Sequence, residues 1–240
     1  MEEIINEYYP AGAKRAVLLC NEKKYKKYEN CICKIIGAKK NGTGFFSKIE
    51  YEGNLVPVLI TNYHVIDDDY IEKNNKLNYY INKDLNVIDI NKDSKLYSSS
   101  DYKYDIMIIR LKEGQAKDYL EIDNNIFKDN AENNYVNENI YILHYANGKE
   151  AKISFGNGLE KVNDYYIKHE LHTEHGSSGG PILSQNTNWV IGIHKAAKKL
   201  DGEYKYNLGT FLKFPLNELK NQNKSKSKGP KVSYNNYYII

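Results

Sequence analysis

One glycine-rich segment reads Leu171-His172-Thr173-Glu174-His175-Gly176-Ser177-Ser178-Gly179-Gly180-Pro181. Glycine enters backbone conformations that side chains forbid, and its missing side chain lets another group come close. Such a loop can hold the hydroxyl of Ser178 outward while it turns the N–H groups of Gly176 and Ser178 toward one point. Two N–H groups arranged in this way stabilise a developing oxyanion. We therefore take Ser178 as the candidate nucleophile and these two amides as the candidate oxyanion hole.

A serine hydroxyl is a weak nucleophile at neutral pH, so this interpretation requires a histidine base and a carboxylate that orients it. The chain supplies both upstream of Ser178. His64 ends an apolar strand pattern, and Asp105 begins another apolar run. The sequence thus predicts a catalytic set of His64, Asp105 and Ser178, in that order along the chain.

Together these segments resemble the chymotrypsin-like (trypsin-fold) serine peptidases. The matching motifs are Thr61-x-x-His64-Val65, Asp105-Ile106-x-x-Ile109-x-Leu111, Gly176-x-Ser178-Gly179-Gly180-Pro181 and the upstream Gly42-Thr43-Gly44-Phe45-Phe46. Three motifs in the expected order are far more specific than any one of them alone. The resemblance covers residues 30 to 220 and is nearest to the short, disulfide-poor branch that includes the staphylococcal glutamyl endopeptidases.

The resemblance implies an all-β fold of two packed six-stranded antiparallel β-barrels with a short C-terminal helix. Short β-rich runs separated by Gly, Asn and Asp agree with it. We expect four regions: an N-terminal extension (1–30), a first barrel with His64 and Asp105 (31–120), a second barrel with Ser178 and the terminal helix (121–221), and a flexible basic, Tyr-rich tail (222–240). A short helix is expected at 116–120, and the active site is expected in the cleft between the barrels.

The residues that would choose the substrate lie around Ser178. In trypsin-like enzymes an aspartate six positions before the serine selects Arg or Lys, but His172 stands there. Thr173 and His194 match the pair with which glutamyl endopeptidases hold an acidic side chain, and the same groups can hydrogen-bond the amide of Gln. Lys195, Ala196 and Ala197 would offer an edge strand to the substrate backbone. The resemblance therefore implies a serine endopeptidase that prefers Glu, or Gln, before the cut.

One position departs from the family pattern. Many relatives that mature by N-terminal cleavage carry an aspartate directly before the nucleophile, where it receives the new ammonium group, whereas this chain has Ser177. Serine cannot form that ion pair. We expect activity to be controlled by a different device.

Other interpretations remain open beside the peptidase. The chain could be a catalytically silent module that binds peptides or proteins, or a hydrolase that acts on esters or only on its own chain. His169, His172 and His175 invite a metal site, but on a strand that runs into a loop their side chains need not converge. Cys31 and Cys33 are one residue apart, so a bridge between them would be strained. No metal or cofactor is expected.

Composition limits the remaining function classes. The 240 residues carry 34 basic and 31 acidic side chains, a net charge of +3, so no strong field favours nucleic acid as a partner. The acidic start lacks the basic end and apolar run of a secretory signal, and no apolar window is long enough to span a bilayer. Three cysteines, none near His64 or Ser178, suit a reducing compartment. We expect a soluble cytoplasmic protein, with export by a non-standard route as the alternative, and a peptide or protein substrate; the oligomeric state stays open.

Overall fold

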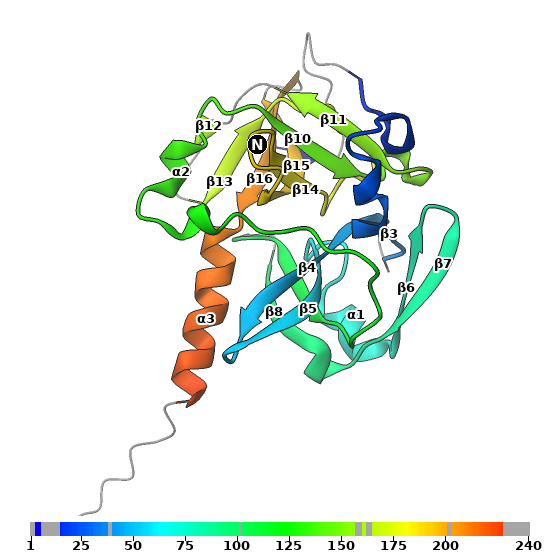
Figure 1. Ribbon diagram of the computed structural model, residues 1–240, viewed down its shortest axis with the longest axis vertical. Coiled ribbons are helices and arrows are strands. Elements are labelled where there is room, and N and C mark those ends of the chain that lie inside the picture. Colours follow the sequence, from blue (N-terminus) through cyan, green and yellow to red (C-terminus); the bar gives the residue numbers. More distant parts are fainter. Residues whose placement is uncertain are drawn as a thin grey trace, which may run out of the picture.

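The structure of the protein is a computed structural model that describes residues 3–5, 15–37, 40–100, 102–156, 160–161, 165–200 and 203–227. Two antiparallel β-sheets form most of it, one above the other in the view of Figure 1. The lower sheet comes from the first half of the chain and the upper sheet mainly from the second half.

The lower sheet has seven strands in the order β7-β6-β3-β4-β5-β9-β8. Their bounds are β3 (Ile32–Ile35), β4 (Gly42–Tyr51), β5 (Asn54–Thr61), β6 (Lys76–Ile81), β7 (Asp84–Asp89), β8 (Lys95–Ser99) and β9 (Ile106–Arg110). The strands alternate between buried and exposed side chains or are buried on both faces, as β-branched and aromatic residues favour. A short helix, α1 (Asp68–Lys73), follows β5, with the Asp67 side chain accepting a hydrogen bond from the Tyr70 N–H as its N-cap.

The upper sheet has the path β12-β13-β16-β15-β14-β10-β11-β2, and β1 pairs with β15 beside this path. The bounds are β1 (Glu3–Ile5), β2 (Val17–Leu18), β10 (Ile140–His144), β11 (Lys152–Gly156), β12 (Glu160–Lys161), β13 (Tyr166–His169), β14 (Pro181–Ser184), β15 (Val190–Leu200) and β16 (Glu203–Phe211). The helix α2 (Ala131–Asn134) lies in the connection between the sheets, and α3 (Lys213–Ser227) follows β16. The longer α3 descends beside the lower sheet, next to β8 (Figure 1).

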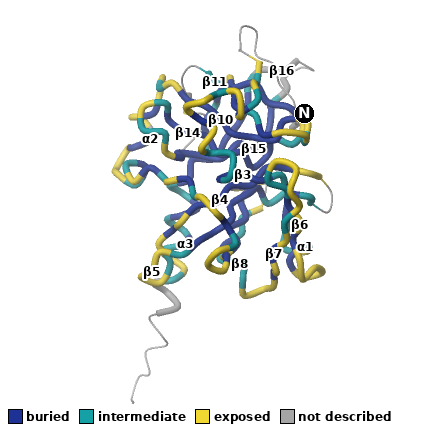
Figure 2. The backbone as a smooth tube through the Cα atoms, turned by 45° about the vertical axis from the view of Figure 1, so that its right-hand side comes forward, coloured by how far each residue is buried: buried dark blue, intermediate teal, exposed yellow. Residues whose placement is uncertain are grey.

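One apolar core joins the two sheets. A single cluster of buried side chains includes Ile32 and Phe45 of the lower sheet together with Tyr141 and Ile193 of the upper sheet. A second cluster, around Phe46, fills the far side of the lower sheet. Figure 2 shows the buried backbone running through the middle of both sheets and the exposed residues gathered at the hairpin tips. The shared core fixes the position of one sheet relative to the other, and hence of any site between them.

The expected all-β fold in two packed units with a C-terminal helix is confirmed. The strand count differs from six per barrel because short segments such as β1, β2 and β12 join the upper sheet and β8 extends the lower one. Among the described residues, neither order of hydrogen-bonded neighbours returns to its first strand, so the sheets do not close into complete barrels.

Two local expectations were wrong. The segment 116–120 is not helical. Its last residue forms a β-bridge with β4 instead, in which the Leu120 N–H donates to the Phe46 carbonyl and the Leu120 carbonyl accepts from the Ser47 hydroxyl. The expected tail from residue 222 begins too early, since α3 continues to Ser227; residues 228–240 lie outside the described residues. Within the described part of the chain, no helix is both long and apolar enough to cross a membrane.

Candidate active site

His64 and Asp105 are brought together by two loops that end strands of the lower sheet. The chain turns at Asn62, whose carbonyl accepts from the N–H groups of Val65 and Ile66, and this turn carries His64 beyond the end of β5. Asp105 directly precedes β9, which pairs with β5. The His64 ring nitrogen Nδ1 lies 2.7 Å from Asp105 Oδ2, and the His64 backbone N–H donates to Asp105 Oδ1 at 3.0 Å.

The Asp105 carboxylate is buried, and its backbone is unusual. Its φ of +54° lies in the left-handed region, which Asp tolerates better than most residues. The Asn62 amide donates to the Asp105 carbonyl at 2.8 Å and holds this conformation. A carboxylate that accepts from both the ring and the backbone of one histidine fixes the orientation of the imidazole.

In the loop that carries Ser178, hydrogen bonds fix the peptide plane before Gly176 and the peptide plane before Ser178. The His175 carbonyl accepts from the Asn147 N–H at 2.7 Å, and the Ser177 carbonyl accepts from the Gly180 N–H at 2.9 Å. In a trans peptide the N–H points opposite to the carbonyl. The N–H of Gly176 therefore points away from Asn147, and that of Ser178 points away from Gly180.

Neither of these two amides donates a hydrogen bond to another residue of the described chain. Glycine is required in this loop at two places. Gly176 has a φ of +89°, and a Cβ there would lie 2.5 Å from the Tyr145 carbonyl oxygen. Gly179 has a φ of +86°, and its Cβ would lie 2.0 Å from the Thr43 carbonyl oxygen. The loop thus presents two unpaired N–H groups at a place where the neighbouring backbone leaves no room for side chains.

Thr43, on β4 of the lower sheet, fastens this loop across the sheet interface. Its N–H donates to the Ser178 carbonyl at 2.7 Å, and its hydroxyl donates to the Gly176 carbonyl at 2.7 Å while accepting from the Tyr145 N–H at 2.9 Å. Ser178 is therefore held by the same sheet that carries His64. The Ser178 hydroxyl itself faces the Lys195 carbonyl at 3.5 Å, and His64 Nε2 is buried without a hydrogen-bond partner among the described residues.

Ser177 lies in a buried chain of directed hydrogen bonds that the sequence did not reveal. The Glu174 N–H donates to Ser177 Oγ, Ser177 Oγ lies 2.8 Å from His144 Nδ1, and His144 Nε2 lies 3.0 Å from Ser154 Oγ. The Ser154 hydroxyl donates to the His172 carbonyl, so Ser154 must accept from His144 Nε2–H. His144 is then the neutral tautomer whose Nδ1 accepts the Ser177 hydroxyl proton.

Burial holds the pKa of His144 well below its usual value, in agreement with a neutral ring. Both ring nitrogens are occupied and the ring is fully buried, and no carboxylate among the described residues is hydrogen-bonded to it. We therefore interpret His144 with Ser154 and Ser177 as a structural network rather than a second catalytic set. The serine before Ser178 is thus fixed from inside the upper sheet.

Near Ser178 the expected pocket residues Thr173 and His194 are both buried. The His194 N–H donates to the Gly180 carbonyl and its carbonyl accepts from the Gly179 N–H, which places His194 directly against the Ser178 loop. His194 Nδ1 lies 3.1 Å from His169 Nε2. The Thr173 hydroxyl donates to Asn207 Oδ1 at 2.9 Å, and the Asn207 amide donates to the Leu171 carbonyl.

Asn207 was missed at the sequence level. It lies on β16 opposite both Ala197 of β15 and His169 of β13. Asn is depleted in strands, so an Asn between Tyr206 and Leu208 in the middle of an apolar strand pattern was the available signal.

His172 and Lys195 were also expected to contact the substrate, but each contacts other residues of the protein. His172 Nδ1 accepts from the Ala16 N–H at 3.0 Å, and its Nε2 lies 3.4 Å from Glu174 Oε1. Lys195 donates from Nζ to the Tyr166 hydroxyl at 2.7 Å. Ala196 and Ala197 are buried in β15.

The remaining candidates lie apart from this site. His169, His172 and His175 do not converge on a metal-binding group within the described chain. Cys31 and Cys33 are free and buried, and burial raises the pKa of the Cys31 thiol to about 12. A cavity of about 750 Å³ opens between α3, β4 and the extended segment near Leu120, and none of the expected catalytic residues lines it.

Comparison with known proteins gives the following matches. The family described as "Trypsin-like peptidase domain" matches residues 42–193. A mutant, inactive form of Rv3671c from M. tuberculosis is 15% identical with a TM-score of 0.57, covering 89% of this chain and 97% of that one. The serine protease of a human pathogenic astrovirus is 17% identical with a TM-score of 0.52, covering 76% and 90%. A serine endoprotease from Yersinia pestis is 10% identical with a TM-score of 0.59, covering 82% and 64%.

At these identities the solved structures show a shared fold and nothing finer. No curated protein matches the sequence. The family match covers residues 42–193 and therefore includes His64, Asp105 and Ser178.

Proposed function

The chain belongs to the trypsin-like peptidase family, and from this premise we propose that it is a serine endopeptidase that uses His64, Asp105 and Ser178. The observation that carries the proposal is the double contact of Asp105 with the His64 ring and backbone, beside a serine loop that is fixed to the same sheet. A histidine that acts as a general base needs a buried carboxylate in this position to orient its ring, whereas a simple β-turn has no need of one.

The geometry supports a defined proton path. Asp105 accepts from His64 Nδ1–H, which leaves the lone pair on Nε2 to act as the base. Rotation of the Ser178 side chain away from the Lys195 carbonyl would direct its hydroxyl to Nε2, and hydrogen bonds of this kind often tighten only when substrate binds. Ser178 then attacks the scissile carbonyl, His64 passes the proton to the leaving amine, and water hydrolyses the acyl-enzyme.

The oxyanion would be stabilised by the N–H groups of Gly176 and Ser178. Their peptide planes are held by partners on the opposite, carbonyl side, and neither amide has an acceptor within the described residues. Donors fixed before the reaction require no reorganisation when charge develops on the oxygen. This preorganisation favours an active peptidase over the catalytically silent binding module.

The side chains expected to contact the substrate support Glu or Gln before the cut. The Leu171 N–H donates to His169 Nδ1, so His169 donates from Nε2 to His194 Nδ1, and His194 keeps a proton on its own Nε2. Burial lowers the pKa of His169 to about 3 and holds that of His194 well below its usual value, so both rings are neutral. A neutral donor at His194 suits a side-chain carbonyl oxygen, and the Thr173 hydroxyl, which donates to Asn207 Oδ1, can still accept from the amide of Gln. Neither group offers a counter-charge to Arg or Lys.

The test is mass spectrometry of a diverse peptide library incubated with the wild-type protein, with Ser178→Ala and with Ser184→Ala. Ser184 is a buried serine in the same sheet that contacts Glu138, so its variant controls for loss of a buried hydroxyl. We expect cuts after Glu or Gln from the wild type and Ser184→Ala, and none from Ser178→Ala. Cuts after Arg or Lys would contradict the pocket, and an uncut library with bound peptides would favour the binding module.

A further inference from the structure

The residues that lead into Asp105 are attached to the C-terminal helix α3 through one carboxylate, that of Glu218. Glu218 Oε1 accepts from the Tyr104 hydroxyl at 3.0 Å and from the Lys103 ammonium group. Its other oxygen, Oε2, accepts from the hydroxyl of Tyr97, on β8, at 2.7 Å. Since Lys103 and Tyr104 directly precede Asp105, a side chain of α3 holds the approach to the proposed catalytic carboxylate.

The surroundings keep the Glu218 carboxyl ionised. Partial burial alone would raise its pKa, but hydrogen bonds from Lys103, Tyr97 and Tyr104 outweigh that effect, so its pKa lies below the usual value. Hydrogen bonds to an ionised acceptor are roughly twice as strong as those between neutral groups. Tyr97 and Tyr104 are both buried, so this cluster is more than an exposed ion pair.

The peptide plane between Tyr104 and Asp105 is fixed on both of its sides. Its carbonyl accepts from the Thr210 hydroxyl of β16 at 2.7 Å, and its N–H donates to the Ser100 carbonyl at 2.9 Å. Asp105 leaves this plane with its left-handed φ of +54°. A residue other than glycine keeps such a conformation only where its surroundings enforce it. The direction of the Asp105 side chain therefore depends on the position of Tyr104.

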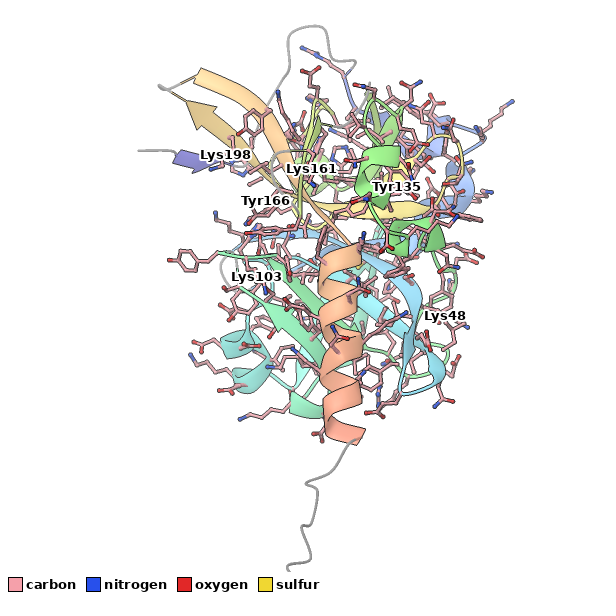
Figure 3. The ribbon with its side chains drawn as sticks, turned by 90° about the vertical axis from the view of Figure 1, so that its left-hand side faces the viewer. Lys48, Lys103, Tyr135, Lys161, Tyr166 and Lys198 are labelled. Carbon is pink, nitrogen blue, oxygen red and sulfur yellow. The ribbon has the colours of Figure 1, made fainter. Side chains whose placement is uncertain are left out.

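A further contact joins the same segment to the strand beside Ser178. The Lys103 carbonyl accepts from the Tyr166 hydroxyl of β13, and this hydroxyl accepts from Lys195 Nζ at 2.7 Å. The carbonyl of Lys195 is the group that faces the Ser178 hydroxyl. Figure 3 shows Lys103 in the lower half of the molecule and Tyr166 in the upper half, on the same side of α3. The segment before Asp105 is thus held from α3 and from the upper sheet.

We propose that Glu218 is a positioning residue of the active site, which acts through Tyr104 and Lys103 to keep Asp105 in the orientation that accepts from His64 Nδ1. The inference rests on the proposed peptidase function and adds to it a residue of the C-terminal helix. Within the described chain, none of the hydrogen bonds of Glu218 reaches a member of the proposed catalytic set, so its effect on the reaction passes through the segment before Asp105.

The alternative is that Glu218 only fastens α3 to the lower sheet. A second ion pair of the same helix allows the two roles to be separated, because Lys220 Nζ lies 3.3 Å from Glu50 Oε2. Glu50 lies on β4 opposite Leu55, outside the segment that leads into Asp105. Glu50→Ala is therefore the matched control: it also removes a carboxylate that joins α3 to the lower sheet.

The first measurement is kcat and KM on a cleaved peptide for the wild type, Glu218→Ala, Tyr104→Phe and Glu50→Ala. Tyr104→Phe keeps the ring, whose centroid lies 5.3 Å from that of Tyr165, and removes only the hydroxyl that reaches Glu218. We expect Glu218→Ala and Tyr104→Phe each to lower kcat by on the order of 10-fold with little change in KM, because a misplaced Asp105 slows the reaction rather than binding. Glu50→Ala should keep the wild-type kcat.

The double variant of Glu218 and Tyr104 tests whether the two residues act together. Because both substitutions break the same link, the double variant should lose little more kcat than either single variant. Losses that multiply would mean that Tyr104 and Glu218 act independently.

The second measurement does not depend on turnover. The proton on His64 Nδ1, which Asp105 Oδ2 accepts at 2.7 Å, should give a proton NMR signal at low field that is absent from His64→Gln. A carboxylate that is held less firmly lets this proton exchange faster with water. We expect the signal to broaden in Glu218→Ala and Tyr104→Phe and to stay sharp in Glu50→Ala.

Together the two measurements separate this inference from the peptidase function. If Glu218→Ala lowers stability in urea but keeps the wild-type kcat and a sharp signal, Glu218 has a structural role only, and the peptidase function stands. An equal loss of kcat in Glu50→Ala would assign the effect to the attachment of α3 and would also overturn the inference. If the wild type cuts no peptide, the peptidase function fails, and the NMR signal alone decides whether Glu218 holds Asp105 against His64.

Discussion

Asp105 combines an unusual backbone conformation with the role proposed for it, the orientation of His64. Its left-handed conformation directs the side chain back to His64, and the two carboxylate oxygens accept from different donors of that residue. Asn also tolerates this conformation. The two roles of Asp105 can therefore be separated by exchanging one oxygen for an amide group.

We expect Asp105→Asn to lower kcat by about 10⁴-fold while the fold persists. The Asn carbonyl oxygen can still accept from the His64 N–H, but its NH₂ group cannot accept from Nδ1–H, so the ring takes the tautomer that is protonated on Nε2 and loses its basic lone pair. The measurements are kcat and KM on a cleaved peptide and thermal unfolding.

The matched control for this prediction is Asp123→Asn. Asp123 is equally buried but accepts from the Asn125 N–H, away from His64 and Ser178. It should leave kcat unchanged. If Asp105→Asn keeps kcat within tenfold of the wild type while its unfolding temperature falls sharply, Asp105 has a structural role only.

At the scale of elements, the position of the Ser178 loop depends on β10, a strand that supplies none of the residues of the loop. β10 supplies His144, whose Nδ1 accepts from the Ser177 hydroxyl, while Ser177 also accepts from the Glu174 N–H. The loop is therefore bonded to the interior of the upper sheet immediately before the nucleophile. Its peptide planes, and with them the candidate oxyanion hole, rest on this attachment.

We expect Ser177→Ala to reduce kcat by on the order of 10-fold or more, since the Ser178 N–H is then less well fixed. It removes the hydroxyl that donates to His144 Nδ1, and a buried unpaired group costs about 1–3 kcal/mol. Urea unfolding and kcat are the measurements, with Ser184→Ala as the control. Both variants should lose stability, but only Ser177→Ala should lose kcat; equal kcat values would contradict the positioning role of Ser177.

The elements differ in how far the sequence revealed them. β6 was predicted with its observed bounds because Leu77 and Tyr79 alternate with the polar residues Lys76 and Asn78, and Asn residues flank the run on both sides. β14 was missed because its four residues, Pro181–Ser184, directly follow the glycine loop and are too few to show a period. The helix expected at 116–120 did not form, and its last residue, Leu120, is hydrogen-bonded to Phe46 and Ser47 of β4. Local propensity cannot anticipate such long-range pairing.

Prediction of the site from the sequence was limited in the same way, by contacts between distant residues. His64, Asp105 and Ser178 were predicted because motif order carries information on distant residues, and the structure places the first two in contact. His144 and Asn207 were not predicted, since each acts through a partner more than thirty residues away, Ser177 for His144 and Thr173 for Asn207. No spacing rule links them; only the folded upper sheet brings them together.

At the scale of the whole molecule, Thr43 joins the two sheets because it is hydrogen-bonded to both halves of the candidate site. From the lower sheet it reaches the carbonyls of Gly176 and Ser178, and its own carbonyl accepts from the Thr61 hydroxyl near His64. Hydrogen bonds in a buried interface are costly to leave unmade. The relative position of the proposed base, His64, and the proposed nucleophile, Ser178, thus depends on the cohesion of the whole fold.

That cohesion should depend on pH, because the upper sheet buries neutral histidines. Burial lowers the pKa of His169 to about 3 and holds the pKa values of His144 and His194 well below 6.5. Below pH 6.5 the unfolded chain therefore binds protons that the folded chain does not, and stability falls as the pH falls. Above pH 6.5 these groups are neutral in both states and add no pH dependence.

We expect the free energy of unfolding to drop by about 3 kcal/mol between pH 6.5 and pH 5.5, roughly 1 kcal/mol for each of the three histidines. Urea unfolding at pH 5.5, 6.5 and 7.5 measures it. This window lies above the titration of ordinary carboxylates, so the buried rings dominate the change. His144→Gln, which cannot titrate, should retain about two thirds of the wild-type drop whatever its absolute stability. A wild type with equal stability at all three pH values would mean that these rings are not held neutral in the fold, and the donor proposed for His194 would lose its basis.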